Sequence, residues 1–176
     1  FMEQRAPQFG TVFTDIPVLA EALGVSPEVI HVEWPSQVVS TGFPALLVPF
    51  RGLPPLKEVE INLPALKQLL GQIPMIYAFC METADTDCQV HARGFAPLVG
   101  IPEDPATGSV AGALGAYVAR YGLLPGLEDL DFQIEQGMEI RRPSRLQVKV
   151  ERQNGEVGSL RVGGPVTRVL EGKMWI

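Results

Sequence analysis

The stretch Gly100-Ile101-Pro102-Glu103-Asp104-Pro105-Ala106-Thr107-Gly108-Ser109 leads directly into a run of small apolar residues, 110–119. Because Asp104 precedes Pro105, its backbone is biased toward an extended conformation outside the following helix. The run contains two glycines, which are unfavourable in an isolated helix and tolerated in a tightly packed one. We therefore predict a helix that begins near Thr107–Ser109 and lies at the centre of the fold, wrapped by a sheet.

The start of this helix has the features of an anion site. The first amides of a helix lack intrahelical acceptors and lie at the positive end of its dipole, so a carboxylate or phosphate can dock there. Gly108 lets a ligand approach the backbone, Ser109 adds a hydroxyl, and Asp104 is placed to face the same ligand. An ordinary helix start explains the same residues, with Asp104 or Thr107 as N-cap and Ser109 bonding its own backbone. The spacing leaves both interpretations open.

The string Glu103-Asp104-Pro105-Ala106-Thr107-Gly108-Ser109, preceded by Ala92-Arg93-Gly94-Phe95-Ala96-Pro97, resembles the phenazine-biosynthesis PhzF-like family of isomerases. The resemblance extends over nearly the whole chain. Its further stretches are Val39-Ser40-Thr41-Gly42-Phe43-Pro44, Gln136-Gly137, Arg142-Pro143-Ser144 and Val162-Gly163-Gly164.

This resemblance implies one half of a diaminopimelate-epimerase-like fold, in which two similar halves enclose the active site. It implies that Thr107, Gly108 and Ser109 bind substrate, and that Asp104 hydrogen-bonds the substrate or relays a proton. Thr41-Gly42 is a further stretch that the resemblance places in the cleft, although a tight turn or bulge at Gly42 explains it as well. In the family, the acid/base glutamate lies in the first half, which nothing in this chain matches.

We therefore expect residues 1–176 to form one domain equivalent to the second half of a PhzF-like protein. Because the sequence starts with Phe1 and not Met, we expect it to be a fragment, a processed piece or one chain of a two-chain sample. We expect residues 164–176 to pair with the absent first half. A length of 176 residues suits a single domain with its own core.

Composition narrows the possible functions. With 46% hydrophobic and 19% charged residues, the chain is typical of globular proteins. Its net charge of -6 argues against binding to nucleic acid or an anionic membrane surface. The longest apolar runs are too short to span a bilayer. We expect a cytoplasmic location.

Two cysteines and nearby acidic residues raise the question of a metal site. Cys88 and His91, with Asp85 and Asp87, suggest a cluster, but strand alternation would point residues 88 and 91 to opposite faces. A structural zinc site normally has four ligands in recognisable pairs. We expect no metal and no cofactor, and we expect Cys80 and Cys88 to be buried thiols.

Periodicity and turn signals predict an α+β fold with a mostly antiparallel, barrel-like sheet around the central helix. Arg93 is placed either to bind a substrate carboxylate or to pair with Glu103 or Asp104, and we favour the internal pair. The expected helices are 15–23 and 62–70; the expected strands are 44–50, 75–81, 89–95, 132–135, 145–151, 158–162 and 166–170, with a hairpin turn at Asn154-Gly155.

The leading functional prediction is a cofactor-independent isomerase or epimerase that moves a proton on a small carboxylate-bearing metabolite. Its expected partners are the N-terminal PhzF-like half, in the same or a second chain, and the substrate; a homodimer is a further option. The alternative is a non-catalytic anion-binding or protein-interaction module, or an inactive fragment. A serine hydrolase is disfavoured because Gly108-Ser109-Val110-Ala111-Gly112 is not a GxSxG elbow.

Overall fold

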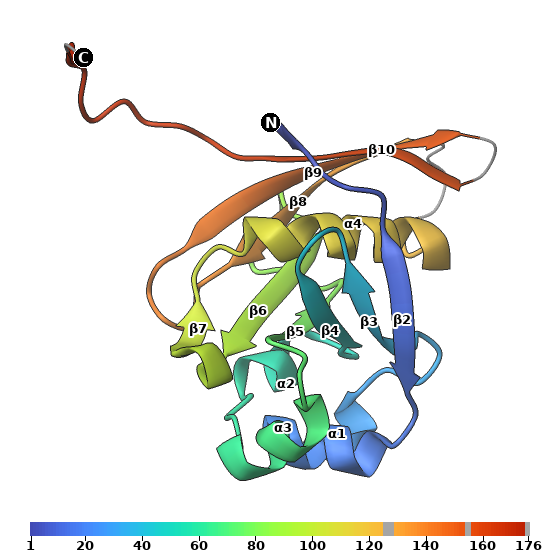
Figure 1. Cartoon of the computed structure of the whole chain (residues 1–176). Helices are drawn as coiled ribbons and strands as arrows, with labels where there is room; N and C mark the ends of the chain where they lie inside the picture. Colours follow the sequence, from blue (N-terminus) through green and yellow to red (C-terminus); the bar gives the residue numbers. More distant parts are fainter. Residues whose placement is uncertain (125–128, 154–155, 175–176) are drawn as a thin grey trace.

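The computed structural model describes residues 1–124, 129–153 and 156–174. A helix of 14 residues, α4 (Gly108–Tyr121), runs through the middle of the molecule. Strands lie on both sides of it, and three shorter helices cover the outer face of one part of the sheet (Figure 1). The predicted arrangement of a central helix wrapped by a sheet is confirmed.

The described strands form one curled sheet in the order β1-β10-β9-β8-β6-β5-β4-β3-β2, with β7 paired to β6. The β4–β5 and β6–β8 pairs are parallel, and the other pairs are antiparallel, as the α+β prediction required. The strands are β1 (Met2–Glu3), β2 (Gln8–Phe13), β3 (Ser36–Ser40), β4 (Pro44–Pro49), β5 (Ile76–Cys80), β6 (Val90–Ala96), β7 (Ile101–Asp104), β8 (Leu130–Gln136), β9 (Ser144–Gln153) and β10 (Glu156–Gly163).

The short helices begin and end where their capping residues predict. In α1 (Ile16–Leu23), the Asp15 carboxylate accepts a hydrogen bond from the Val18 amide, and Gly24 closes the helix with a φ of 66°. In α3 (Leu63–Leu70), the Asn62 side chain accepts from the Ala65 amide. The third short helix, α2 (Leu53–Lys57), has five residues.

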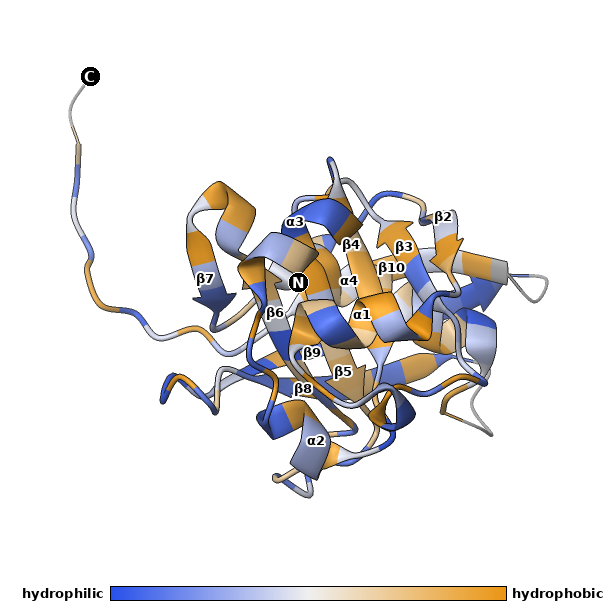
Figure 2. Cartoon of the chain, turned by 90° about the horizontal axis from the view of Figure 1, so that it is seen from below, coloured by the Kyte–Doolittle hydropathy of each residue, from blue (hydrophilic) through white to orange (hydrophobic). Residues whose placement is uncertain are grey.

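Strand alternation divides the apolar side chains into two cores. Along β4, Ala45 and Leu47 face the core around α4, whereas Leu46 and Val48 face the core under α1, α2 and α3. This strand is therefore buried on both faces, which fits its continuous apolar sequence. Figure 2 looks onto the side of α1 and α3, where the strands behind these helices are mostly hydrophobic.

The surroundings of α4 explain its small residues. Every residue from Val110 to Ala119 is buried. A Cβ atom on Gly115 would lie 2.5 Å from a Val148 methyl group, and one on Gly112 would lie 2.9 Å from the Gln4 side chain. The glycines thus let β9 and the N-terminal segment approach the helix backbone closely.

The predicted strand 166–170 is wrong. Strand β10 ends at Gly163, and residues 164–174 follow without regular structure, leading away from the body (Figures 1 and 2). Val166 is 93% exposed and Leu170 87% exposed. Strand β10 lies between β1 and β9, and β1 pairs only up to Met2, so the described part of the chain offers this segment no neighbour.

The predicted turn at Asn154-Gly155 lies outside the described residues, although the strands that flank it pair with each other. Within the described ranges, no helix has the length and hydropathy needed to cross a membrane.

Replacing Gly115 with Ala will destabilise the fold by about 1–2 kcal/mol. Overpacking against the stiff Val148 side chain costs about 1–3 kcal/mol and outweighs the gain of up to about 1 kcal/mol in helix propensity. Urea unfolding measures the difference. Gly108→Ala is the matched control in the same helix, because nothing lies within 4 Å of its added Cβ atom. Equal stability of the two variants would show that α4 does not need this close approach.

Candidate functional site

The side chain of Gln136, at the end of β8, fixes the loop that leads into α4. It is fully buried. Its Oε1 accepts hydrogen bonds from the Thr107 amide at 3.1 Å and the Tyr77 hydroxyl at 2.8 Å. Its Nε2 donates to the Asp104 carbonyl at 2.6 Å and the Thr107 hydroxyl at 2.9 Å. Burial raises the pKa of Tyr77, so its hydroxyl stays a donor.

Asp104 and Thr107 support this loop from within. One Asp104 carboxylate oxygen accepts from the Thr107 hydroxyl at 2.9 Å, and the other accepts from the Ala106 amide at 3.4 Å. Thr107 occupies the N-cap position, but its side chain bonds Asp104 and Gln136 instead of a helix amide. In this structure both predicted site residues hold the loop, and their contact with a substrate stays a prediction.

The first turn of α4 presents free backbone donors. The amides of Val110 and Ala111 bond the Thr107 carbonyl at 3.1 Å and 3.0 Å. Among the described residues, no acceptor is hydrogen-bonded to the amides of Gly108 or Ser109. Ser109 is exposed, and no atom lies within 4 Å of the position of a Cβ on Gly108. These two donors and the helix dipole suit an anion.

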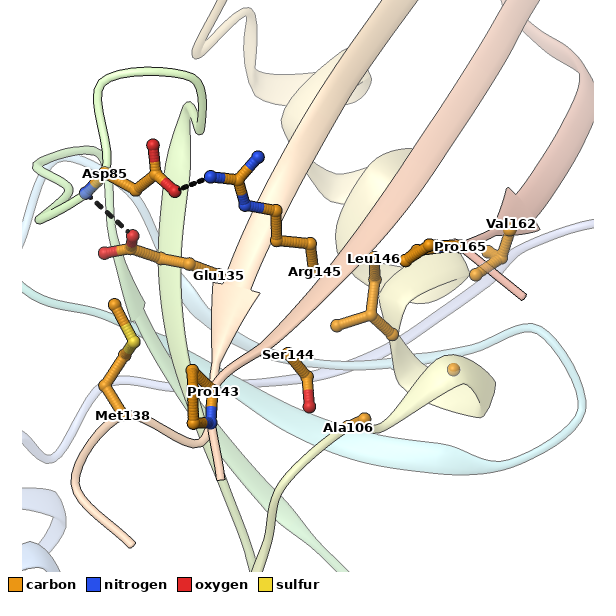
Figure 3. Close-up of a pocket in the computed structure, with 13 residues that line it drawn as sticks. Asp85, Ala106, Glu135, Met138, Pro143, Ser144, Arg145, Leu146, Val162 and Pro165 are labelled. Atoms are coloured by element: carbon orange, nitrogen blue, oxygen red, sulfur yellow. Dashed lines mark hydrogen bonds and ion pairs between the residues drawn. The ribbon is translucent and has the colours of Figure 1, made fainter. Parts of the chain in front are cut away.

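A cavity of about 770 Å³ opens beside this helix start (Figure 3). Gly108 is the predicted site residue that lines it. At one end Asp85 pairs with Arg145, and Glu135 lies next to them. The lining residues are Asp85, Ala106, Gly108, Glu135, Met138, Pro143, Ser144, Arg145, Leu146, Val162, Gly163, Gly164 and Pro165.

Thr41 and Gly42 form the turn between β3 and β4. The buried Thr41 hydroxyl lies 3.5 Å from the Ser109 carbonyl, so this turn contacts the first turn of α4. Gly42 has a φ of 130°, which favours glycine, and its amide bonds the Ser40 hydroxyl. The tight turn considered at Gly42 is therefore present, while a role of both residues in a substrate cleft stays a prediction.

Buried charges gather on β6 next to the cavity. His91 contacts Glu135 at 2.6 Å through Nδ1 and Glu139 at 3.1 Å through Nε2. Arg93 makes a bidentate pair with Glu103 at 2.9 Å and 2.8 Å, which confirms the predicted internal pairing. Arg93 also donates to the three backbone carbonyls of Leu56, Lys57 and Val59.

The cysteines are free and buried, as predicted. Burial raises the pKa of the Cys80 thiol to about 12. Ligand atoms of Asp85, Cys88 and Glu135 lie within 4.8 Å of one another. Both oxygens of Glu135 already accept hydrogen bonds, from the amides of Ala84 and Asp85, and Asp85 pairs with Arg145. We do not identify these residues as metal ligands.

The sequence reasoning missed the roles of Gln136 and of His91 with its two glutamates. Gln136-Gly137 entered only as a stretch that resembles the family, and His91 only as a member of the metal cluster that strand alternation disfavoured. The available signal was the alternation of His91 and Arg93 in an otherwise apolar strand, because buried charges require partners. Glu135 and Glu139 are such partners, and they lie in the stretch that contains Gln136.

The family model for phenazine biosynthesis-like proteins (PhzC-PhzF) matches residues 1–172. The chain belongs to this family. A solved Bacillus anthracis phenazine biosynthesis protein of the PhzF family has a TM-score of 0.83 and 30% identity, covering 93% of this chain and 56% of that one. A predicted epimerase from Pseudomonas aeruginosa has a TM-score of 0.70 and 34% identity, covering 93% and 54%.

Several curated relatives of this PhzF-like chain are described as isomerases. A Bacillus subtilis protein described as an uncharacterized isomerase is 33% identical, covering 97% of this chain and 59% of its own length. The Pseudomonas aeruginosa trans-2,3-dihydro-3-hydroxyanthranilate isomerase is 36% identical over 48% of this chain and 30% of its own length. The chain spans about half the length of the curated relatives that it matches.

Replacing Gln136 with Glu will destabilise the fold by about 2–3 kcal/mol at pH 7. The carboxylate lacks the Nε2 donor, so the Asp104 carbonyl loses its partner and faces an acceptor. The loss of stability will be smaller at lower pH, because the introduced carboxyl group becomes protonated and regains one donor. Denaturant unfolding at pH 7 and pH 5 measures both effects.

The matched control is Gln133→Glu, on the same strand but half-buried. We expect it to change stability by less than about 0.5 kcal/mol. An equal loss in both variants would mean that the four hydrogen bonds of Gln136 do not hold the loop.

Proposed function

We propose that this chain forms the anion-binding part of a PhzF-like isomerase that transfers a proton on a small carboxylate-bearing metabolite without a cofactor. The observation that carries the proposal is the pair of free amides at Gly108 and Ser109, in the first turn of a helix whose Gly108 lines the cavity and whose preceding loop is fixed by Gln136. Membership in a family in which several curated relatives are described as isomerases supports the reaction class. We propose a cytoplasmic location for it.

The chemistry follows from the donors. Removal of a proton next to a carboxylate or a conjugated system leaves an anionic intermediate, which preorganised amides stabilise without moving. The amides of Gly108 and Ser109 would bind this charge, with the Ser109 hydroxyl as a third donor. Asp104 would relay a proton by exchanging its bond to the Thr107 hydroxyl for one to the substrate. We propose that the main acid/base glutamate comes from outside this chain.

A binding module without turnover is the second candidate function. Both carboxylates among the cavity lining are engaged: Asp85 by Arg145, and Glu135 by His91 and two amides. A base must be free to accept a proton, so these two carboxylates are poor general bases as they stand. In this alternative the chain binds an anionic ligand and leaves its carbon–hydrogen bonds unchanged.

Titration with trans-2,3-dihydro-3-hydroxyanthranilate tests the proposal. This compound is a small carboxylate and appears in the name of one relative. We expect saturable NMR shifts of the Gly108 and Ser109 amides. Gly108→Val will weaken binding at least about tenfold because its methyl groups enter the cavity, and Ser109→Ala will weaken it a few-fold. Ser26→Ala, an exposed serine next to α1 with no side-chain cap bond, is the control. Unchanged affinity in Gly108→Val would overturn the site.

Catalysis is tested separately in D₂O. In a longer PhzF-like protein that supplies the glutamate, deuterium incorporation at carbon that is lost in Asp104→Asn with the fold intact would support the isomerase. Saturable binding with no incorporation, even after a longer PhzF-like chain supplies the remaining length, would favour the binding module.

A further inference from the structure

A buried imidazole on β6 lies between two carboxylates and connects this strand to the wall of the cavity. His91 is fully buried, with Nδ1 2.6 Å from Glu135 and Nε2 3.1 Å from Glu139. An ionised carboxylate only accepts hydrogen bonds, so two such contacts require a proton on both ring nitrogens. The geometry therefore describes His91 as an imidazolium.

The two carboxylates that contact His91 are held with different strength. Glu135 is fixed by the amides of Ala84 at 2.7 Å and Asp85 at 2.9 Å, and its side chain is 2% exposed. Glu139 is 12% exposed, and its Oε2 has no hydrogen-bond partner among the described residues. The Nε of Arg93 lies 3.9 Å from that oxygen, which is an ion pair without a hydrogen bond. Loss of one proton from His91 would therefore break the contact to Glu139 and keep the one to Glu135.

Glu139 lies in the β8–β9 loop, residues 137–143, which forms one wall of the cavity through Met138 and Pro143. The loop closes on itself through a 2.8 Å bond from the Arg142 amide to the Gly137 carbonyl. Arg141 has a φ of 58°, a left-handed conformation that costs of order 1 kcal/mol for a non-glycine residue. The contact of Glu139 with His91 ties this loop to the body of the protein.

The same loop touches the segment that leads into α4. A Cβ atom on Gly137 would lie 2.9 Å from the carbonyl oxygen of Pro105 and 2.4 Å from that of Arg142. Movement of the loop is therefore transmitted both to the cavity wall and to the neighbourhood of the free amides at Gly108 and Ser109.

We propose that His91 is a positioning residue that works as a proton-dependent latch: as an imidazolium it ties Glu139, and with it the loop 137–143, to the body of the protein. Loss of the Nε2 proton to solvent leaves a lone pair facing the Glu139 carboxylate, and the loop is released from the cavity wall. The Nδ1 proton remains donated to Glu135. This inference goes beyond the proposed function, because it concerns the wall of the cavity and requires no turnover.

The surrounding charges set the pH range of the latch. Burial opposes the charge on His91, but the hydrogen bonds and charges of Glu139 and Glu135 outweigh it and raise the pKa of His91 above 6.5. Burial likewise opposes ionisation of Glu139, yet His91 lowers the pKa of Glu139 below 4.5. The ionisable groups facing the latch are Glu135 from β8, Glu139 from the loop, Arg93 from β6, Glu103 from β7, Cys80 from β5, and Glu82 and Asp85 from the β5–β6 loop.

The sign of the stability change follows from these shifts. A histidine whose pKa is raised on folding stabilises the folded state fully below its unfolded value of about 6.5. That contribution is lost as pH rises through the raised pKa of His91. The lowered pKa of Glu139 acts on the acid side of the range. The contribution of Glu139 to the stability of the folded state is lost as pH falls below about 4.5. The latch is therefore closed between these limits and opens on the alkaline side.

NMR titration of the full chain tests the latch, because the sequence contains only two histidines. His31→Gln assigns the imidazole signals, and the pKa of His31 is lowered, by burial and then by Arg51, so the two titrations separate. We expect His91 to carry protons on both ring nitrogens at pH 6. Above its pKa, amides 138–142 will shift and exchange faster with the same midpoint, while those of Ala84 and Asp85 stay protected.

Glu139→Gln is the decisive variant, because it removes one charge and keeps an acceptor for Nε2. We expect the His91 midpoint to fall by about one pH unit and the loop midpoint to fall with it. Glu151→Gln, which removes a half-buried carboxylate paired with Arg161, is the control and should move neither midpoint. A loop that titrates independently of His91, or a His91 with one proton at pH 6, would overturn the latch. These readouts need no ligand, so a failure of the proposed function would leave this test intact.

Discussion

The four hydrogen bonds of the Gln136 side chain join three parts of the molecule that are distant in sequence: β5 through Tyr77, the segment 104–107, and the end of β8 itself. An amide side chain offers two donors and two acceptor positions, and all of them are used. A buried network that is fully satisfied specifies one arrangement of its members, because any other leaves a polar group unpaired. The orientation of the first turn of α4, and of its free amides, depends on this single residue.

The packing of the body of α4 in the core also fixes the position of the free amides at its start. A helix buried over ten consecutive residues, 110–119, requires strands close to its backbone, and the glycines at 112 and 115 permit that approach. With the helix body fixed in the core, its N-terminus opens beside the cavity, where Gly108 is part of the lining. The rigid helix therefore places backbone donors at a defined position, which loop residues alone would hold less precisely.

Local features of the fold were predictable, and features that depend on pairing between distant segments were not. The caps Asp15 and Asn62 and the doubly buried strand 44–50 are readable from neighbouring residues. His91 meets Glu135 only because β6 and β8 pair in parallel, across 44 residues of sequence. The wrong prediction of a strand at 166–170 also depends on distant pairing. The pattern of residues along a segment can predict a strand, but it does not show whether another strand lies beside it. Of the site, the helix start with Asp104 and Thr107 was predicted, and the Gln136 side chain that holds them was not.

The end of β8 explains why two polar clusters lie side by side. Successive residues of a strand point to opposite faces, so Glu135 faces His91 while Gln136 faces Tyr77 and the segment before α4. A shift of register by one residue would exchange these two side chains and leave a carboxylate among acceptors and an amide beside the imidazolium. The next residue, Gly137, has a φ of 82° and admits no Cβ against Arg142 and Pro105, so the chain must turn there. One register therefore fixes both the anion-facing helix start and the loop that closes the cavity.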